Sequence, residues 1–213
     1  MMKMKILSIE YGQKRYGNIF KDFGWDVVRA GEDAYKKIVA DETITAVHFS
    51  GGHDVSPALY GEDNRYSHCS VDRDALEDLV YKAAKARGLP CIGICRGSQF
   101  LTVMNGGKLY QDVKGHTGAH AMQTHADGVF PVTSTHHQMM RPSGNYHLLG
   151  WANHGFDKKT GTGEIVNNQG EVDPEVVYYP DTSDLAVQYH PEYMDKSTQG
   201  YQYFHQLLET YYA

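Results

Sequence analysis

Apolar residues occur along the first half of the chain in short runs, separated by longer segments with helical spacing. Four runs rich in β-branched residues predict strands over Lys5–Ile9, Trp25–Val28, Ala46–Phe49 and Cys91–Ile94. The segments between them predict helices over Tyr16–Phe23, Ala34–Ala40 and Asp72–Arg87. Strands and helices that alternate at this spacing are typical of βαβ units around a mostly parallel sheet.

The longest of these helices, Asp72–Arg87, carries small and apolar residues at steps of three and four positions. Ala75, Leu79, Ala83 and Ala86 build one apolar face by this spacing, and the charged residues between them predict a solvated face. The following Gly88-Leu89-Pro90 ends the helix, because glycine is favoured just past a helix end and proline shortly after it.

The second half is less regular. It predicts strands, some of them antiparallel, over Phe130–Val132, Tyr146–Gly150, Glu164–Val166, Val176–Tyr179 and Leu185–Tyr189. A final helix is expected over Thr198–Tyr211, packed on the sheet through its aromatic and leucine positions, and the polar segment Gly155–Gly170 predicts a surface loop. Because no repeat or linker interrupts the chain, we expect one domain over residues 1–213.

Composition narrows the functional classes. The 213 residues are 41% apolar, which suffices for one sizeable core. The net charge of −6 lacks the basic footprint of a nucleic-acid binder. No apolar run approaches a membrane span, and no apolar signal core follows the first four residues. Three cysteines do not predict a disulfide framework and favour a reducing compartment, so we expect a soluble cytoplasmic protein.

The segment around Cys95 carries the strongest chemical signal. An apolar strand runs into Gly93-Ile94-Cys95-Arg96-Gly97, and a helical stretch begins near Gln99. This order matches a nucleophile elbow, in which a strand turns sharply into a helix beside the nucleophile. The helix N-terminus favours a thiolate, and the backbone N–H of Arg96 points where an oxyanion forms. Without a catalytic partner, Cys95 would equally fit a buried core cysteine.

A thiol nucleophile needs an imidazole, and the imidazole needs a group that orients it. In Val187-Gln188-Tyr189-His190-Pro191-Glu192 a predicted strand ends near His190, and a carboxylate follows two residues later on the same side. Sites in open α/β sheets gather at the carboxyl ends of strands. His-Pro-Glu alone is typical of a surface turn, but together with the elbow it predicts a Cys95–His190–Glu192 triad.

Six ordered motifs carry a resemblance to a known family. They are Ser50–Glu62, Asp72–Asp74 with Glu77, Gly93–Gln99, Gly106–Asp112, Ser134–Gln138 and Val187–Glu192. These stretches resemble the class I glutamine amidotransferase superfamily, and within it the γ-glutamyl hydrolase branch (peptidase family C26), which includes the γ-glutamyl-γ-aminobutyrate hydrolases. The chain departs from the branch in looking shorter after Asp112. It also has only Gly163-Glu164-Ile165 near an expected acidic motif, and Tyr189 stands where tryptophan is common.

The resemblance implies a flavodoxin-like α/β fold, with a mostly parallel central sheet flanked by helices and some antiparallel strands in the C-terminal half. It implies Cys95 as nucleophile, His190 as general base and acid, and Glu192 as the orienting carboxylate. The oxyanion hole would combine the amide of Arg96 with that of Gly52 or Gly51. The residues expected to bind the glutamyl group are Gly51, Gln99, Thr135, His136, His137 and Gln138. The implied reaction hydrolyses a γ-glutamyl amide through a thioester on Cys95.

The histidines His116, His120 and His125, with His136 and His137, raise the question of a metal site. Their spacing matches no zinc motif and no H-E-x-x-H occurs, so we expect no metal or other cofactor. We interpret them as hydrogen-bonding residues of polar loops near the site.

Three functions stay open from the sequence. A stand-alone γ-glutamyl amide hydrolase is favoured by the C26-like motifs. A glutaminase subunit that delivers ammonia to a separate synthetase is the alternative. A non-catalytic binding module on the same fold is the third, since fold does not fix function, although the intact triad argues against it. The sequence leaves open the leaving amine, the synthetase partner, the oligomeric state, the pathway and the organism.

Overall fold

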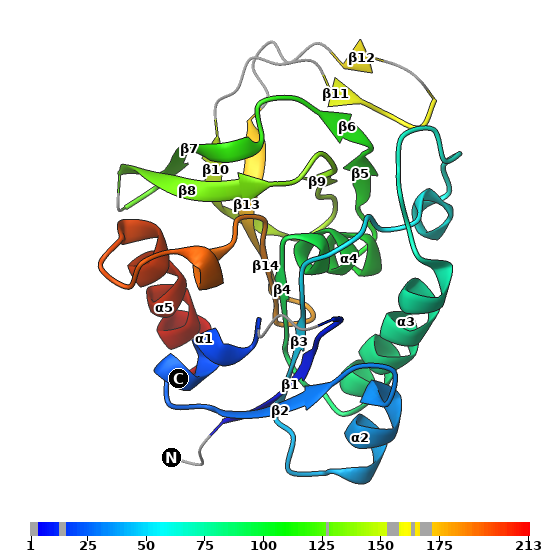
Figure 1. Cartoon of the computed structure of the whole chain (residues 1–213), viewed down its shortest axis with the longest axis vertical. Coiled ribbons are helices and arrows are strands. Elements are labelled where there is room, and N and C mark those ends of the chain that lie inside the picture. The colour runs from blue at the N-terminus through cyan, green and yellow to red at the C-terminus, as the bar shows by residue number, and fades with distance from the viewer. Residues whose placement is uncertain (1–3, 13–15, 127, 153–157, 163–164, 167–171) are drawn as a thin grey trace.

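The computed structural model describes residues 4–12, 16–126, 128–152, 158–162, 165–166 and 172–213 (Figure 1). Its helices are α1 (Asn18–Asp22), α2 (Ala34–Ala40), α3 (Val71–Ala86), α4 (Arg96–Met104) and α5 (Gln199–Tyr212), with short 3₁₀ turns η1 (Pro57–Tyr60) and η2 (Pro191–Tyr193). Its strands are β1 (Lys5–Ile9), β2 (Asp26–Ala30), β3 (Ala46–Phe49), β4 (Cys91–Ile94), β5 (Lys108–Tyr110), β6 (Asp112–Val113), β7 (Thr117–Thr124), β8 (Val129–Thr135), β9 (Met139–Arg141), β10 (His147–Ala152), β11 (Lys158–Lys159), β12 (Ile165–Val166), β13 (Asp173–Tyr179) and β14 (Asp184–Val187).

The large sheet has nine strands in the order β2-β1-β3-β4-β14-β13-β10-β7-β8. The first five strands pair in parallel, and from β14 onward each neighbouring pair is antiparallel. The parallel part has the 2-1-3-4-5 order of flavodoxin-like sheets. The predicted fold class is therefore confirmed, with the antiparallel strands added along one edge.

Helices cover both faces of the parallel part (Figure 1). Alternate residues of the central strands point to opposite faces, so Ile6 and Ile92 pack with α1 and α5, whereas Leu7, Val47 and Phe49 pack with α2, α3 and α4. Each fully buried side chain of this size contributes about 1.5–3 kcal/mol relative to exposure. This two-faced core fixes the carboxyl ends of β3, β4 and β14 at one edge of the sheet.

The apolar face predicted for α3 is wrong. Ala75, Leu79 and Ala86 are exposed, Leu79 by 49%. The face that packs on the sheet includes Val80 and Tyr81, and it also buries the charged residues Arg73, Asp74 and Glu77. These buried charges pair with Arg96 and with backbone carbonyls of the segment after β3. The spacing of residues within the helix cannot predict such distant partners.

Several elements differ from the sequence expectation. Helix α4 begins at Arg96, directly after Cys95 and three residues before the expected start. The strands β5, β6, β7 and β9 were not predicted, because their residues are largely polar or too few to form an apolar run. The expected loop Gly155–Gly170 lies partly outside the described residues, as do Gly163 and Glu164, but its described parts contain β11 and β12.

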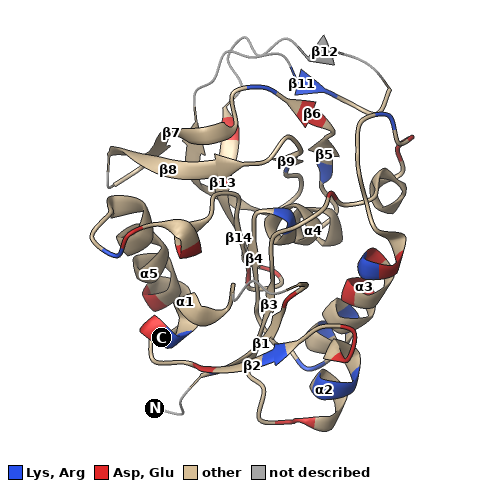
Figure 2. Cartoon of the chain, viewed as in Figure 1, with Lys and Arg blue, Asp and Glu red and all other residues tan. Residues whose placement is uncertain are grey.

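Figure 2 shows acidic and basic residues close together on several elements, including α3 and the β6–β11 edge. At that edge Lys159 Nζ lies 2.5 Å from Asp112 Oδ2. All three cysteines are free thiols. Within the described ranges, no helix has the length and apolar character needed to cross a membrane.

Candidate active site

Cys95 occupies a strained turn between β4 and α4. Its backbone has φ 54° and ψ −110°, a conformation that L residues rarely adopt outside functional turns. The flanking glycines are required sterically. A Cβ on Gly93 would lie 2.3 Å from the Gly97 carbonyl oxygen, and a Cβ on Gly97 would lie 1.9 Å from that of Phe49. The backbone N–H of Cys95 donates to the carbonyl of Val187 at 2.8 Å, which ties the elbow to the end of β14.

His190 follows β14 and reaches Cys95 from the neighbouring strand. Its Nδ1 lies 2.6 Å from Glu192 Oε1, and both side chains are about 5% exposed or less. The ring of Tyr193 stacks on the imidazole with centroids 4.6 Å apart. Burial lowers the pKa of His190, but the hydrogen bond and charge of Cys95, together with Glu192, outweigh it and raise the pKa to about 10.

Gly51 and Gly52 follow β3 and lie between the Cys95–His190 pair and α3. A Cβ on Gly51 would lie 2.9 Å from His190 Cε1 and 3.6 Å from Cys95 Cβ. A Cβ on Gly52, which has φ +145°, would lie 2.2 Å from Arg73 Nη1. The backbone of Arg96 starts α4 beside Cys95, while its side chain is buried against Asp74 and Glu77. The three positions predicted for the oxyanion hole therefore lie close to Cys95.

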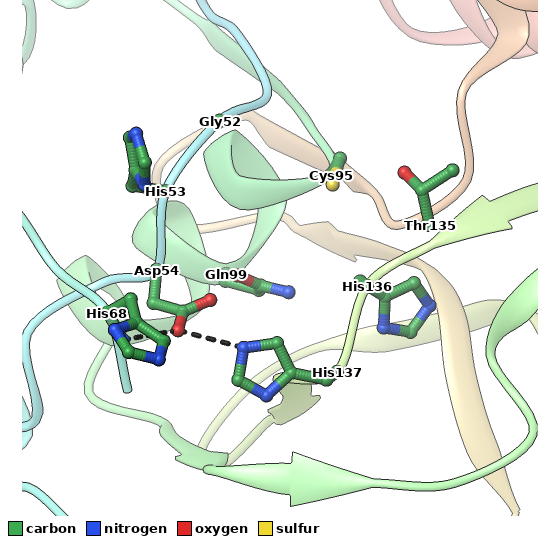
Figure 3. Close-up of a pocket in the computed structure, with 9 residues that line it drawn as sticks. All are labelled: Gly52, His53, Asp54, His68, Cys95, Gln99, Thr135, His136 and His137. Carbon is green, nitrogen blue, oxygen red and sulfur yellow. Dashed lines mark hydrogen bonds and ion pairs between the residues drawn. The ribbon is translucent and has the colours of Figure 1, made fainter. Parts of the chain in front are cut away.

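A pocket of about 400 Å³ opens in front of Cys95 (Figure 3). It is lined by Gly52, His53, Asp54, His68, Cys95, Gln99, Thr135, His136 and His137. Across it, His137 Nε2 lies 2.9 Å from Asp54 Oδ2. The hydrogen bond with this carboxylate raises the pKa of His137. Asp54 also accepts a hydrogen bond from the backbone of His68 at 2.7 Å. The pocket therefore combines the Cys95 thiol with a carboxylate and several imidazoles.

Of the residues expected to bind substrate, Gln99, Thr135, His136 and His137 line this pocket, and Gly51 borders Cys95. The side chain of Gln138 does not reach the pocket. It is fully buried, donates to the Val55 carbonyl at 3.1 Å and accepts from the Val55 N–H at 3.1 Å. Its carbonyl accepts hydrogen bonds from Gln99 Nε2 at 2.8 Å and bonds His136 Nδ1 at 2.7 Å. Gln138 thus anchors two pocket residues through its backbone.

The interpretation as hydrogen-bonding loop residues fits His116, which lies between β6 and β7, but it is wrong for His120, which stands on β7. Both are buried behind the pocket wall, where His116 Nε2 lies 3.0 Å from Asp173 Oδ2 and His120 Nε2 lies 2.9 Å from Glu175 Oε1. His125 is exposed, and its ring lies 4.7 Å from that of Trp151. Tertiary pairing with carboxylates on β13 draws the first two inward.

Opposite charges balance in this buried cluster. Burial lowers the pKa of His116, but Asp173 and Glu175 outweigh it and raise it to about 9. Burial raises the pKa of Glu175, but His116 and His120 outweigh it and lower it to about 2. Lys158 Nζ lies 2.5 Å from Asp173 Oδ1, so a lysine and a protonated His116 face two carboxylates.

Among the described residues, His116, His136 and Glu175 also have potential metal-ligand atoms within 4.8 Å of one another. Burial lowers the pKa of His136 to about 3, so its imidazole is neutral.

Sequence reasoning missed Asp54 and Arg73 as residues of the site. Both stand inside quoted motifs, Ser50–Glu62 and Asp72–Asp74, so the signal was present as local sequence. Their roles depend on contacts across the fold, namely Asp54 with His137 and Arg73 with the Gly51 backbone. Glu175, which organises the buried histidines, carried no motif signal.

Comparisons with known proteins identify the family of the chain. The Peptidase C26 family profile matches residues 24–155. A candidate glutamine amidotransferase of Mycobacterium tuberculosis is 36% identical over 163 residues, covering 71% of this chain and 51% of that protein. The chain thus spans about half the length of this relative. A candidate glutamine amidotransferase-like protein of Lactococcus lactis, YvdE, is 31% identical over 209 residues, covering 87% of this chain and 82% of the relative.

Solved structures agree on the fold. The crystal structure of a glutamine amidotransferase from Thermotoga maritima superposes with a TM-score of 0.63 at 14% identity. The match covers 99% of this chain and 86% of that one. At this identity the likeness establishes the architecture alone.

Proposed function

The chain belongs to the Peptidase C26 family, and on this premise we propose that it hydrolyses a γ-glutamyl amide as one domain over residues 1–213. Family membership supports amide hydrolysis in general. The observation that carries the finer proposal is a cysteine in a strained elbow, which lies with His190 around the same glycine, Gly51, while Nδ1 of that imidazole lies 2.6 Å from a carboxylate. This arrangement is that of a nucleophile, a base and an orienting group.

In the acylation half, the Cys95 thiolate attacks the γ-carbonyl carbon of the substrate. The carbonyl oxygen becomes an oxyanion, which the backbone N–H groups of Arg96 and of Gly52 or Gly51 stabilise. The tetrahedral intermediate collapses by breaking the C–N bond, and His190 donates its Nε2 proton to the departing amine. A γ-glutamyl thioester on Cys95 is left, with neutral His190 held by Glu192.

In the hydrolytic half, neutral His190 takes a proton from water as that water attacks the thioester carbonyl. The second tetrahedral intermediate uses the same amides. Its collapse breaks the C–S bond, releases glutamate and restores the thiolate–imidazolium pair. Glu192 supports both halves, because a carboxylate on Nδ1 keeps Nε2 directed at the nucleophile and stabilises the imidazolium.

The pocket supports a small substrate. Its volume of about 400 Å³ lies toward the lower end of the range for small-molecule sites, roughly 300–1,000 Å³. A glutamyl group carries both an ammonium and a carboxylate, and the pocket presents Asp54 beside His137. We assign binding of the glutamyl group to Gln99, Thr135, His136 and His137, and expect a compact leaving amine.

A second candidate is a glutaminase that passes ammonia to a synthetase on a separate chain. It is favoured by the relatives described as glutamine amidotransferases, since such enzymes transfer the amide nitrogen of glutamine. The two functions share the chemistry at Cys95 and differ in whether the free protein turns over.

The test incubates the purified protein with glutamine and a panel of γ-glutamyl amines, and measures released glutamate and amine. Cys95→Ala is compared with Cys91→Ala, which removes a buried thiol at the start of β4. We expect turnover that survives Cys91→Ala and disappears in Cys95→Ala. Full activity in Cys95→Ala would refute the proposal. Negligible turnover, with Cys95 still labelled by a glutamine-analogue electrophile, would favour the synthetase-dependent glutaminase.

A further inference from the structure

A buried arginine of α3 holds the backbone that faces the nucleophile. The side chain of Arg73 is 6% exposed. Its Nη2 donates to the carbonyl of Ser50 at 2.9 Å, and its Nη1 donates to the carbonyl of Gly51 at 3.2 Å. Two consecutive carbonyls thus point at one guanidinium, which regular extended backbone does not allow, because its successive carbonyls point to opposite sides.

This contact fixes the direction of the next two amides. A trans peptide is planar, with its C=O and N–H pointing in opposite directions. The N–H groups of Gly51 and Gly52 therefore both point away from Arg73. The side away from Arg73 is the side of the reaction, because the Cβ direction of Gly51 meets His190 and Cys95. Successive N–H groups on one side form a concave anion site.

The glycine at position 52 is explained by the same contact. With φ +145°, any Cβ there would be strained, and it would lie 2.2 Å from Arg73 Nη1. The guanidinium occupies the space that a side chain at this position would need. Arg73 and Gly52 therefore fit as a pair.

The same network reaches the other oxyanion amide. Arg73 Nε donates to Glu77 Oε1 at 2.9 Å, and the second oxygen of Glu77 bonds the side chain of Arg96. Arg96 also pairs with Asp74, whose Oδ2 accepts from the Ser56 N–H at 3.0 Å. Two arginines and two carboxylates are thus buried together. Glu77 joins the residue that aims Gly51 and Gly52 to the residue whose own N–H lies next to Cys95.

We propose that Arg73 is a positioning residue that aims the Gly51 and Gly52 amides at the oxyanion, and that Glu77 holds Arg73 in register with Arg96. The proposal rests on the hydrolysis proposed above and deepens it. Toward the site, Arg73 contacts the outer side of the glycine backbone and acts on the reaction through it. Lysine cannot replace it, since a single ammonium lacks the planar fork that bonds two carbonyls and a carboxylate at once.

The test compares Arg73→Lys with Arg87→Lys. Arg87 is a matched control, because its guanidinium also binds backbone carbonyls, those of Ile38 and Ile44 at 2.8 Å, but away from the site. Three quantities are measured for each variant: kcat and KM for the best γ-glutamyl amide, the rate at which iodoacetamide alkylates Cys95, and the affinity for a γ-glutamyl aldehyde. Alkylation at a saturated carbon forms no oxyanion, whereas the aldehyde forms a thiohemiacetal that does.

Removing an oxyanion donor lowers kcat by about 10²- to 10³-fold. Misdirected amides should lower kcat by a smaller factor, because the donors are still present. For Arg73→Lys we expect kcat and aldehyde affinity to fall by about 10- to 100-fold. KM and the alkylation rate should stay within about threefold of wild type. Arg87→Lys should change none of the three by more than about twofold.

Two results would overturn the proposal. One is a folded Arg73→Lys variant whose kcat and aldehyde affinity match those of wild type. The other is a loss of alkylation rate as large as the loss of kcat, which would mean that Arg73 only supports the fold around Cys95. If Arg73→Lys does not fold, Glu77→Gln is judged by the same readouts, because it keeps an acceptor for Arg73 and removes the charge that joins the two arginines.

The two proposals fail in different ways. If the wild-type protein cleaves no γ-glutamyl amide, the proposed function fails. The affinity for the aldehyde can still be measured without turnover, from the protection of Cys95 against iodoacetamide. Comparing this affinity between wild type and Arg73→Lys then tests the role of Arg73.

Discussion

Raising the pH from about 6 to about 10 should destabilise the folded protein through His116. This imidazole is buried between two carboxylates, with its Nε2 3.0 Å from Asp173 Oδ2 and its Nδ1 3.4 Å from Glu175 Oε1. His120 and His136 also face it, with ring centroids 4.9 and 4.6 Å away. The protonated ring is the form that both carboxylates stabilise.

The sign and size follow from linkage. The pKa of His116 is about 9 in the folded protein, against an ordinary value of 6.5. The folded state holds this proton more tightly than the unfolded state. The contribution of His116 to the free energy of unfolding is therefore complete below pH 6.5 and is lost as the pH rises through about 9. At about 1.4 kcal/mol for each pH unit, the interval is worth about 3 kcal/mol. That is a substantial part of the total of roughly 5–15 kcal/mol for a folded domain.

The assay is urea unfolding of the wild type and of His116→Gln at about pH 6, 8 and 10. Glutamine cannot carry the charge, so the variant should be less stable by about 3 kcal/mol at pH 6, and the difference should shrink toward pH 10. The same comparison cancels the contribution of His190, whose raised pKa acts in the same direction in both proteins. The exposed His125→Gln is the control and should show no such difference. A gap between wild type and His116→Gln that stays constant across this range would refute the charge assignment.

Three further outcomes are expected. Glu192→Gln should lower kcat by about 10²- to 10⁴-fold with the fold intact, since the amide cannot stabilise the imidazolium of His190; a loss below about tenfold would contradict that role. Gly97→Ala should lower the unfolding free energy by about 3 kcal/mol or more, because its Cβ would lie 1.9 Å from a backbone carbonyl oxygen of β3. Gly31→Ala, whose nearest contact is at 3.5 Å, is the control for thermal unfolding, and equal melting temperatures would count against the close packing. Asp184→Ala should lower the free energy of unfolding in urea by about 3–5 kcal/mol, because this fully buried carboxylate accepts hydrogen bonds from four groups. Asp184 begins β14, whereas His190 follows the other end of that strand. A lower kcat at temperatures where the variant is folded would therefore contradict a purely structural role.

The parts of the site that the sequence predicted are those encoded within a few residues. The elbow at Cys95 is specified by a buried strand, two glycines and the helix that follows. The structure explains both glycines by contacts at 2.3 and 1.9 Å. His190 and Glu192 are separated by one proline, and the 3₁₀ turn η2 places their side chains in contact. The strands β1, β3 and β4 have the predicted bounds, because each is a short apolar run buried on both faces.

The parts that it did not predict depend on distant partners. Periodicity placed the wrong face of α3 on the core, since it counted Arg73 and Glu77 as solvated charges. Burying them is tolerable only because Arg96 and the carbonyls of Ser50 and Gly51 meet them across the fold. In the same way, strand β7 carried no apolar run, and His120 on it is buried because Glu175 lies opposite. A pattern that scores only hydrophobicity cannot detect a charge whose partner lies far away in the sequence.

The buried charges also explain how one pocket wall is held rigid. His136 lines the pocket, and its ring packs on that of His116 in the cluster behind it. Its Nδ1 bonds the Gln138 carbonyl, which also accepts a hydrogen bond from the side chain of Gln99, another residue of the pocket. Gln138 is in turn fixed by the Val55 backbone. The orientation of the Gln99 side chain in the pocket therefore depends on β13, the β8–β9 segment and the loop after β3 together. Side chains that define a site must themselves be fixed by their neighbours. In this pocket wall, carboxylate–histidine and amide–backbone contacts fix them, rather than apolar packing.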